Sequence, residues 1–144
     1  MKQKNEHIRD IPDVGHYLYR AFSVAHNKII EGKEDIWDAG TTTLLSGICL
    51  ELEPQSDDRN WCFVCASVGD CKAFLWSKRT NDIIDVTAGN RIDQKDARDP
   101  GGRLGPYLDH GNPDLRNLNL YCVGCEDGDL IIIVSGNVNI NKLF

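Results

Sequence analysis

Apolar side chains recur at three- and four-residue steps near the start of the chain, a spacing that predicts an amphipathic helix over residues 10–31. Its apolar stripe is Val14, Leu18, Ala21, Phe22, Ala25 and Ile29. Asp13 is placed to cap the first turn of this helix, and Gly32 is placed to end it. His16 and His26 lie off the stripe. Because no convergent metal-ligating side chains accompany them, we expect both histidines to face solvent.

The pattern after Trp37 changes to short apolar and β-branched runs, which predict strands. The expected strands span residues 41–52, 61–68, 71–76, 83–86, 120–123 and 130–134. We expect the last two to form a hairpin around Glu126-Asp127-Gly128. Residues 88–118 are irregular and rich in Gly, Pro and Asp, which is typical of a functional or mobile connection. The pattern therefore predicts an α+β fold, with one helix packed on a largely antiparallel sheet.

Composition refines this picture mainly by exclusion. The 144 residues are 41% hydrophobic and 26% charged, which suits one folded domain with a buried core. We expect this domain to span residues 10–144, after a polar tail of residues 1–9. A net charge of -6 with scattered basic residues argues against binding to nucleic-acid phosphates. No segment is long and apolar enough to span a bilayer. We therefore expect neither nucleic acid, because of the charge, nor a membrane, because of the missing span, as a partner.

The six cysteines indicate a compartment and raise one candidate site. The first residues are too polar for a secretory signal, so we expect reduced thiols in a cytoplasmic protein, with the nucleus as the alternative. Cys62 and Cys65, and likewise Cys122 and Cys125, form C-x-x-C pairs, which together would suit a tetrahedral Zn²⁺ site. However, Cys62 and Cys65 lie in an expected strand, where residues three apart point to opposite faces. We therefore expect core cysteines rather than zinc ligands.

The irregular segment carries a run of acidic residues. Asp93, Asp96 and Asp99 recur at three-residue steps, as in a calcium-binding loop. They lack the glycine spacing and the terminal glutamate of an EF-hand loop, so a solvated acidic loop is the prediction. No serine or cysteine of the sequence stands in a recognisable nucleophile motif.

Several stretches, taken in order, indicate a family. They are Ala39-Gly40-Thr41-Thr42-Thr43, Ser67-Val68-Gly69-Asp70-Cys71-Lys72-Ala73, Gly101-Gly102-Arg103-Leu104 and Asp129-Leu130-Ile131-Ile132-Ile133-Val134-Ser135. Over roughly residues 14–138, the chain resembles the central part of the metal-dependent protein phosphatases, the PPM type or protein phosphatase 2C. Members of that family carry G-G-T-T or G-T-T-A, then N-V-G-D-S-R-A, then a G-G-x-V/I segment, and then D-x-F-L-I-L-A-S-D-G.

The resemblance implies a partial α-β-β-α sandwich, mostly of antiparallel strands, with an N-terminal amphipathic helix. It also implies hydrolysis of phosphoserine and phosphothreonine in phosphoprotein substrates. In that chemistry two Mg²⁺ or Mn²⁺ ions, held by aspartates, lower the pKa of a bridging water that attacks phosphorus in line.

Two parts of the resemblance supply candidate site residues. Asp70 matches the family's Gly-Asp turn near the metal centre and is the candidate metal ligand. Its alternative role is that of a turn residue, with which Gly69 closes a hairpin. Gly101, Gly102 and Arg103 match a segment that borders the substrate cleft in the family. The alternative for that segment is a flexible loop with a solvated arginine.

Most carboxylates that hold the family's metal ions have no counterpart here. The sequence lacks a D-G-H-G-G motif, and with it the first metal aspartate and the histidine proposed as general acid. It also lacks the upstream arginine that holds the substrate phosphate. The family's second metal aspartate follows the serine of the last strand, where this sequence has Gly136 after Ser135. A further family aspartate would lie beyond Phe144.

We therefore expect a truncated, catalytically impaired phosphatase domain in which metal binding is doubtful. One alternative is a pseudophosphatase or regulatory module that binds a protein partner or self-associates through exposed sheet edges. Another alternative is a module stabilised by zinc at the cysteine pairs.

Overall fold

The computed structural model describes residues 10–52, 60–90, 96 and 98–136. The expected tail of residues 1–9, Asp93 and the last residues of the expected domain, 137–144, lie outside these ranges. The helices and strands are α1 (Ile11–Ile30), η1 (Ile36–Ala39), β1 (Leu44–Glu51), β2 (Trp61–Val68), β3 (Lys72–Trp76), β4 (Ile83–Asp85), η2 (Asp109–Gly111), β5 (Asn119–Cys125) and β6 (Leu130–Val134). The strands form two antiparallel sheets, ordered β1-β2-β5 and β4-β3-β6. The α+β class expected from the sequence is confirmed.

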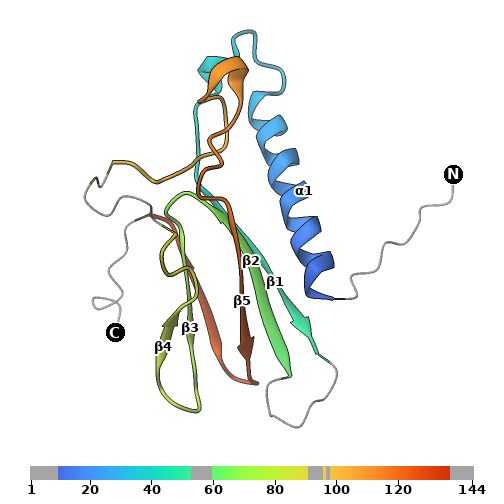
Figure 1. The fold of residues 1–144 in the computed structure, drawn as a ribbon, viewed down its shortest axis with the longest axis vertical. Coiled ribbons are helices and arrows are strands. Elements are labelled where there is room, and N and C mark those ends of the chain that lie inside the picture. Colours follow the sequence, from blue (N-terminus) through green and yellow to red (C-terminus); the bar gives the residue numbers. More distant parts are fainter. Residues whose placement is uncertain (1–9, 53–59, 91–95, 97, 137–144) are drawn as a thin grey trace, which may run out of the picture.

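The elements are arranged in layers of helix, sheet and sheet (Figure 1). Between α1 and the sheet β1-β2-β5 lies a core of Val14, Leu18, Phe22, Cys62, Val64, Ala66, Val68 and Leu104. Between the two sheets lies a second core of Phe63, Cys65, Ala73, Leu75 and Cys125. β2 contributes to both cores because successive side chains of a strand point to opposite faces. The described residues contain no second helical layer over the sheet β4-β3-β6, so the layers they form are one helix and two sheets.

The long helix α1 has nearly the predicted bounds but a different cap. Asp10 is the N-cap, and its carboxylate accepts a hydrogen bond from the backbone N–H of Asp13 at 2.9 Å. The prediction of Asp13 as the cap is therefore wrong, because Asp13 lies inside the first turn, where its negative charge suits the helix dipole. Gly32 follows the helix with a positive φ of 73°, as expected for a stop.

Within the described ranges, no helix combines the length and the apolar character that crossing a bilayer requires.

The two histidines of α1 differ in their surroundings. His16 is exposed, as expected. The prediction that His26 also faces solvent is wrong: His26 is half-buried, and its Nδ1 accepts a hydrogen bond from the backbone N–H of Gly105 at 3.2 Å. The helical periodicity alone does not reveal this difference, because the residues that cover His26 come from a distant part of the chain.

The strands lie close to where the sequence predicts them, but the expected hairpin of the last two strands and the alternative of a hairpin at Gly69-Asp70 are both wrong. β5 pairs with β2, whereas β6 pairs with β3, so the segment around Asp127 joins two sheets rather than closing a hairpin. The Gly69-Asp70 turn likewise joins β2 to β3, which belong to different sheets. Proximity in sequence favours hairpins, but here burial of both faces of β2 decides which strands pair.

The cysteines are all free thiols. Cys62 and Cys65 belong to the helix–sheet core and the sheet–sheet core respectively, which confirms that they point to opposite faces. Cys71 and Cys125 are also buried, whereas Cys49 and Cys122 are exposed. Burial raises the pKa of the Cys65 thiol from 9.0 to about 11. The core-cysteine expectation for the two C-x-x-C pairs thus holds for Cys62, Cys65 and Cys125 and fails for Cys122.

These buried thiols are expected to make the fold sensitive to alkaline pH. Burial raises the pKa of Cys62 and Cys125 as well as that of Cys65. Below the unfolded thiol pKa of 9.0, folded and unfolded states both keep these protons, so stability is at its full value. As pH rises from there through the folded pKa, the unfolded state loses protons first and the free energy of unfolding falls. Cys65 alone should account for about 2–3 kcal/mol once pH exceeds its folded pKa.

Urea titrations across this alkaline range check the expectation. Replacing Cys65 by alanine should reduce the pH dependence of the free energy of unfolding, whatever it does to stability at neutral pH. Replacing the exposed Cys49 by alanine is the matched control and should change that dependence much less, because Cys49 contributes only through its charge near Cys125. An unfolding free energy that stays constant from about pH 8 to about pH 11 would contradict the prediction.

Candidate functional site

The stretches that carry the family resemblance meet at one end of the two sheets. β1 begins at Leu44, which pairs with Val68 at the end of β2. β3 begins at Lys72, which pairs with Val134 at the end of β6. Asp70 precedes the start of β3 by two residues, and Gly136 follows the end of β6 by two residues. The Gly-Asp turn and the Ser135-Gly136 step therefore leave the β3–β6 ladder at the same end.

The two remaining stretches reach the same place. The Thr43 Oγ1 and the Cys71 Sγ are 3.3 Å apart, which joins the threonine run to the Gly-Asp turn. Thr42 and Leu104 form an antiparallel bridge, which joins the threonine run to the Gly101-Gly102-Arg103 segment. All four stretches noted in the sequence are thus brought together.

Two buried asparagines hold the Gly69-Asp70 turn. The Asn117 Oδ1 accepts a hydrogen bond from the Gly69 N–H at 2.9 Å. The Asn117 Nδ2 lies 3.0 Å from the Gly69 carbonyl oxygen, 2.7 Å from that of Asn90 and 3.2 Å from that of Pro100. The Asn90 Nδ2 donates to the Cys71 carbonyl at 2.6 Å. These side chains tie the turn to two segments that are distant in sequence.

Glycine is required where this network packs most closely. A Cβ at Gly101 would lie 2.5 Å from the Asn117 Nδ2, and a Cβ at Gly102 would lie 2.4 Å from the Asn117 Oδ1. At Gly69, which has a positive φ of 93°, a Cβ would lie 2.3 Å from the Thr43 Cγ2. Gly101 and Gly102 are buried and closely packed, so the alternative of a flexible loop at this segment is wrong.

Asp99 links the arginines beside this turn. The Arg116 Nη2 lies 2.6 Å and 2.7 Å from the two carboxylate oxygens of Asp99, and the Gly101 N–H donates to Asp99 at 2.9 Å. The Arg103 Nη2 is 3.5 Å from the same carboxylate. The hydrogen bond from the Gly101 N–H is the main cause that holds the pKa of Asp99 below its usual value. The charges of the Arg116 and Arg103 guanidinium groups lower this pKa further. The expectation of a solvated acidic loop is therefore wrong for Asp99, while Asp96 is exposed.

Arg103 is packed rather than solvated. Its guanidinium carbon lies 4.1 Å from the centre of the Tyr107 ring, a cation–π contact. Its side chain is 19% exposed, and its Nε is buried with no hydrogen-bond acceptor within the described part of the chain. Two of its contacts, to Asp99 and to Tyr107, therefore fix the orientation of the guanidinium group.

The residues at this end do not fit a binuclear Mg²⁺ or Mn²⁺ centre. Such ions require several oxygen ligands each, mostly carboxylates and waters. Asp70 is a half-buried carboxylate at the turn, while Gly136, two residues after β6, contributes no side-chain oxygen. Within residues 10–52, 60–90, 96 and 98–136, no three His, Cys, Asp or Glu side chains are grouped as a metal site would need.

Comparisons with protein-family models, with curated proteins and with solved structures found no match to this chain.

The geometry of the candidate site depends largely on three residues that no sequence pattern indicates: Asn90, Asn117 and Arg116. Their partners are backbone carbonyls, a backbone N–H and a carboxylate that only folding brings near. The one available signal is general: residues 88–118 form a long irregular segment, and polar side chains in such segments often serve the backbone around them.

Proposed function

We propose that the chain is a domain of the metal-dependent protein phosphatase type whose 144 residues do not by themselves hydrolyse phosphoproteins. The observation that carries this proposal is the meeting of the Gly69-Asp70 turn, the Gly101-Gly102-Arg103 segment and the Ser135-Gly136 step at one end of two stacked antiparallel sheets. The same observation supports the loss of activity, because glycine stands where the resemblance calls for a carboxylate.

The chemistry of the site supports this loss. Metal-dependent phosphoryl hydrolysis needs two ions that stabilise the attacking and leaving oxygens, and one carboxylate is too few to hold them. Arg103 could attract a phosphate group, but its guanidinium already contacts Asp99 and Tyr107. Binding a phosphate there would require competition with the Asp99 carboxylate.

A regulatory module that binds a protein partner or a second copy is the second candidate. Four apolar side chains on the outer strands β4 and β6 are more than one-third exposed: Ile83 at 37%, Ile84 at 47%, Ile133 at 49% and Leu130 at 54%. Exposed apolar groups on outer strands favour association. Sedimentation of the purified chain tests this candidate, and a stable monomer over a wide concentration range would contradict self-association.

The proposal predicts that the purified chain shows no EDTA-sensitive hydrolysis of a phosphoserine peptide in the presence of Mn²⁺. Replacing Gly136 by aspartate is expected to raise Mn²⁺ affinity about tenfold or more, because it adds a second carboxylate at the end of the β3–β6 ladder where Asp70 lies. A Cβ at Gly136 meets no atom within 4 Å, and aspartate is among the residues that best tolerate the positive φ of 72° found there. Calorimetric titration with Mn²⁺ measures the gain.

Matched variants separate ligand geometry from a general effect of charge. Replacing Gly136 by alanine imposes the same backbone constraint without an oxygen and should add no metal affinity. Combining Gly136→Asp with Asp70→Asn should remove the gain. Robust EDTA-sensitive turnover by the unmodified chain would contradict the proposed loss of activity. Equal Mn²⁺ affinity in Gly136→Asp and Gly136→Ala would contradict the placement of the site.

A further inference from the structure

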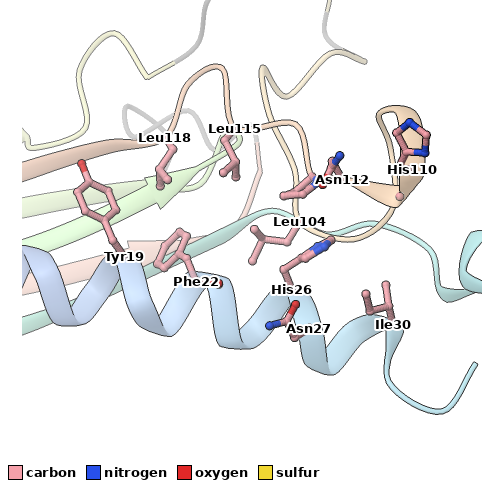
Figure 2. A pocket seen from close by; sticks show the side chains of 13 residues that line it. Tyr19, Phe22, His26, Asn27, Ile30, Leu104, His110, Asn112, Leu115 and Leu118 are labelled. Carbon is pink, nitrogen blue, oxygen red and sulfur yellow. The ribbon is translucent and has the colours of Figure 1, made fainter.

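A cavity of about 450 Å³ lies between the C-terminal half of α1 and the segment of residues 104–118 (Figure 2). This volume is within the range of small-molecule sites. None of the residues that hold the Gly69-Asp70 turn lines it. Phe22 and Leu104, which are 2% and 1% exposed, join the cavity to the helix–sheet core. Tyr19, at 44% exposed, also lines the cavity, so the space opens from apolar core toward solvent.

His26 projects from α1 toward the Leu104 and Asn112 side of this cavity (Figure 2). Its Nδ1 accepts the Gly105 N–H at 3.2 Å, and a ring nitrogen that accepts a hydrogen bond carries no proton. The imidazole in this arrangement is therefore the neutral tautomer with its hydrogen on Nε2. Within the described ranges the hydrogen bond of the His26 ring is the one to Nδ1, and His26 lines the cavity, so its Nε2 hydrogen is available to a bound molecule.

The wall opposite α1 is held by close backbone contacts. Gly105 has a positive φ of 92°, and a Cβ there would lie 2.2 Å from the Gly40 carbonyl oxygen. A Cβ at Gly111 would lie 2.4 Å from the Ile36 Cδ1. The Asn112 carbonyl accepts the backbone N–H groups of residues 107 and 108 at 3.1 Å and 2.8 Å. A site whose walls are fixed in this way loses little conformational entropy on binding.

The lining determines the chemical class of an occupant. No Asp, Glu, Lys or Arg is among the described residues that line the cavity, and the basic groups there are the imidazoles of His26 and His110. No side chain with a permanent charge is therefore present among these described residues to balance a charge on a bound molecule. Phe22, Leu104 and Leu118 offer an apolar surface, and His26 offers a directed donor. We propose that this cavity binds a small uncharged molecule that has an aromatic or branched apolar body and a carbonyl-type oxygen, which accepts a hydrogen bond from the His26 Nε2. This binding does not depend on the proposed phosphatase relationship.

The first test is a titration of the full chain with three probes of one shape and different charge: 2-naphthamide, 2-naphthoate and 2-naphthylmethylamine. Two-dimensional ¹H–¹⁵N NMR reports where each probe binds. We expect 2-naphthamide to shift the amides of Gly105, Gly111 and Asn112 in a saturable manner. Both charged probes should bind at least about tenfold more weakly than 2-naphthamide, since their charge is unpaired in the cavity. No saturable shift at these amides, or a preference for a charged probe, would overturn the proposal.

Variants of His26 test the donor itself. Asparagine at this position keeps an acceptor near the place of Nδ1 for the Gly105 N–H, but its amide nitrogen does not reach the place of Nε2. We expect His26→Asn to weaken 2-naphthamide binding about tenfold, the usual effect of losing one hydrogen bond of this kind. Glutamine extends an amide donor to the place of Nε2, so His26→Gln should bind within about threefold of the unmodified chain. Equal affinity in His26→Asn and the unmodified chain would overturn the assignment.

Two further variants serve as controls. His16 is exposed on the same helix, so His16→Asn should leave probe binding unchanged. Ser23 is exposed and lines the cavity, so phenylalanine in its place should fill the space and abolish binding while His26 is intact. The amide spectrum of each variant reports whether the fold is retained. Undiminished binding in Ser23→Phe would place the probe elsewhere and overturn the proposal.

Discussion

Replacing Asn117 by alanine is expected to lower the free energy of unfolding by about 3–5 kcal/mol, because several buried backbone groups lose their partner at about 1–3 kcal/mol each. Asn117 is 3% exposed, so water does not readily replace its amide. The Gly69 N–H and the carbonyls of Gly69, Asn90 and Pro100 all contact this one side chain. Urea titration followed by tryptophan fluorescence measures the loss.

Two further variants serve as comparisons for Asn117→Ala. Asn117→Asp keeps the shape but replaces the donor nitrogen by an oxygen that faces three carbonyls, so we expect it to destabilise at least as much as alanine. Asn60 is exposed, and Asn60→Ala should change stability by no more than about 0.5 kcal/mol. The amides of Gly69 and Asp70 should shift in the Asn117 variants. A loss below about 1 kcal/mol in Asn117→Ala would contradict the role of this network.

Replacing Phe22 by alanine is expected to cost about 3–5 kcal/mol of folding free energy, the usual loss for a buried phenylalanine. Phe22 is 2% exposed and lies in the core between α1 and the sheet β1-β2-β5. Its ring also lines the cavity, so the neighbouring space offers no side chain that could readily fill the void. Thermal unfolding followed by circular dichroism at the helix band measures the change.

The matched control for Phe22 is on the same helix. Tyr19 is 44% exposed, and Tyr19→Ala should cost about 1 kcal/mol or less. Phe22→Leu retains most of the apolar volume and should cost about 1–2 kcal/mol. If Phe22→Ala and Tyr19→Ala had equal effects, α1 would not be held to the sheet by the core described above.

The secondary structure was largely predictable because it depends on local periodicity. One apolar stripe predicts α1, and Val14, Leu18 and Phe22 of that stripe are buried. β2 has the predicted bounds although its side chains do not alternate, since it is the central strand and is buried on both faces. The cap was not predictable from the residue type, because Asp10 and Asp13 are both suitable and only the extended backbone conformation of Asp10 distinguishes them.

The candidate site was predictable only in part. Order and residue type indicate Asp70, the Gly101-Gly102-Arg103 segment and the Ser135-Gly136 step, and the structure brings these together. The alternatives of a hairpin turn at Asp70 and a flexible loop at Gly101 fail. Both rest on local turn chemistry, whereas the partner strand and the close packing against Asn117 are set by distant residues.

The sequence by itself determined where the helix and strands form and that position 136 carries no carboxylate, because both are properties of a residue and its near neighbours. Only the tertiary structure decided which strands pair, what holds the Gly69-Asp70 turn and which tautomer His26 adopts. Asn117 meets Gly69 across 48 residues, and His26 meets Gly105 across 79. The direction of a hydrogen bond over such separations depends on how the helix and the sheets pack together. A local pattern of polar and apolar residues does not predict it.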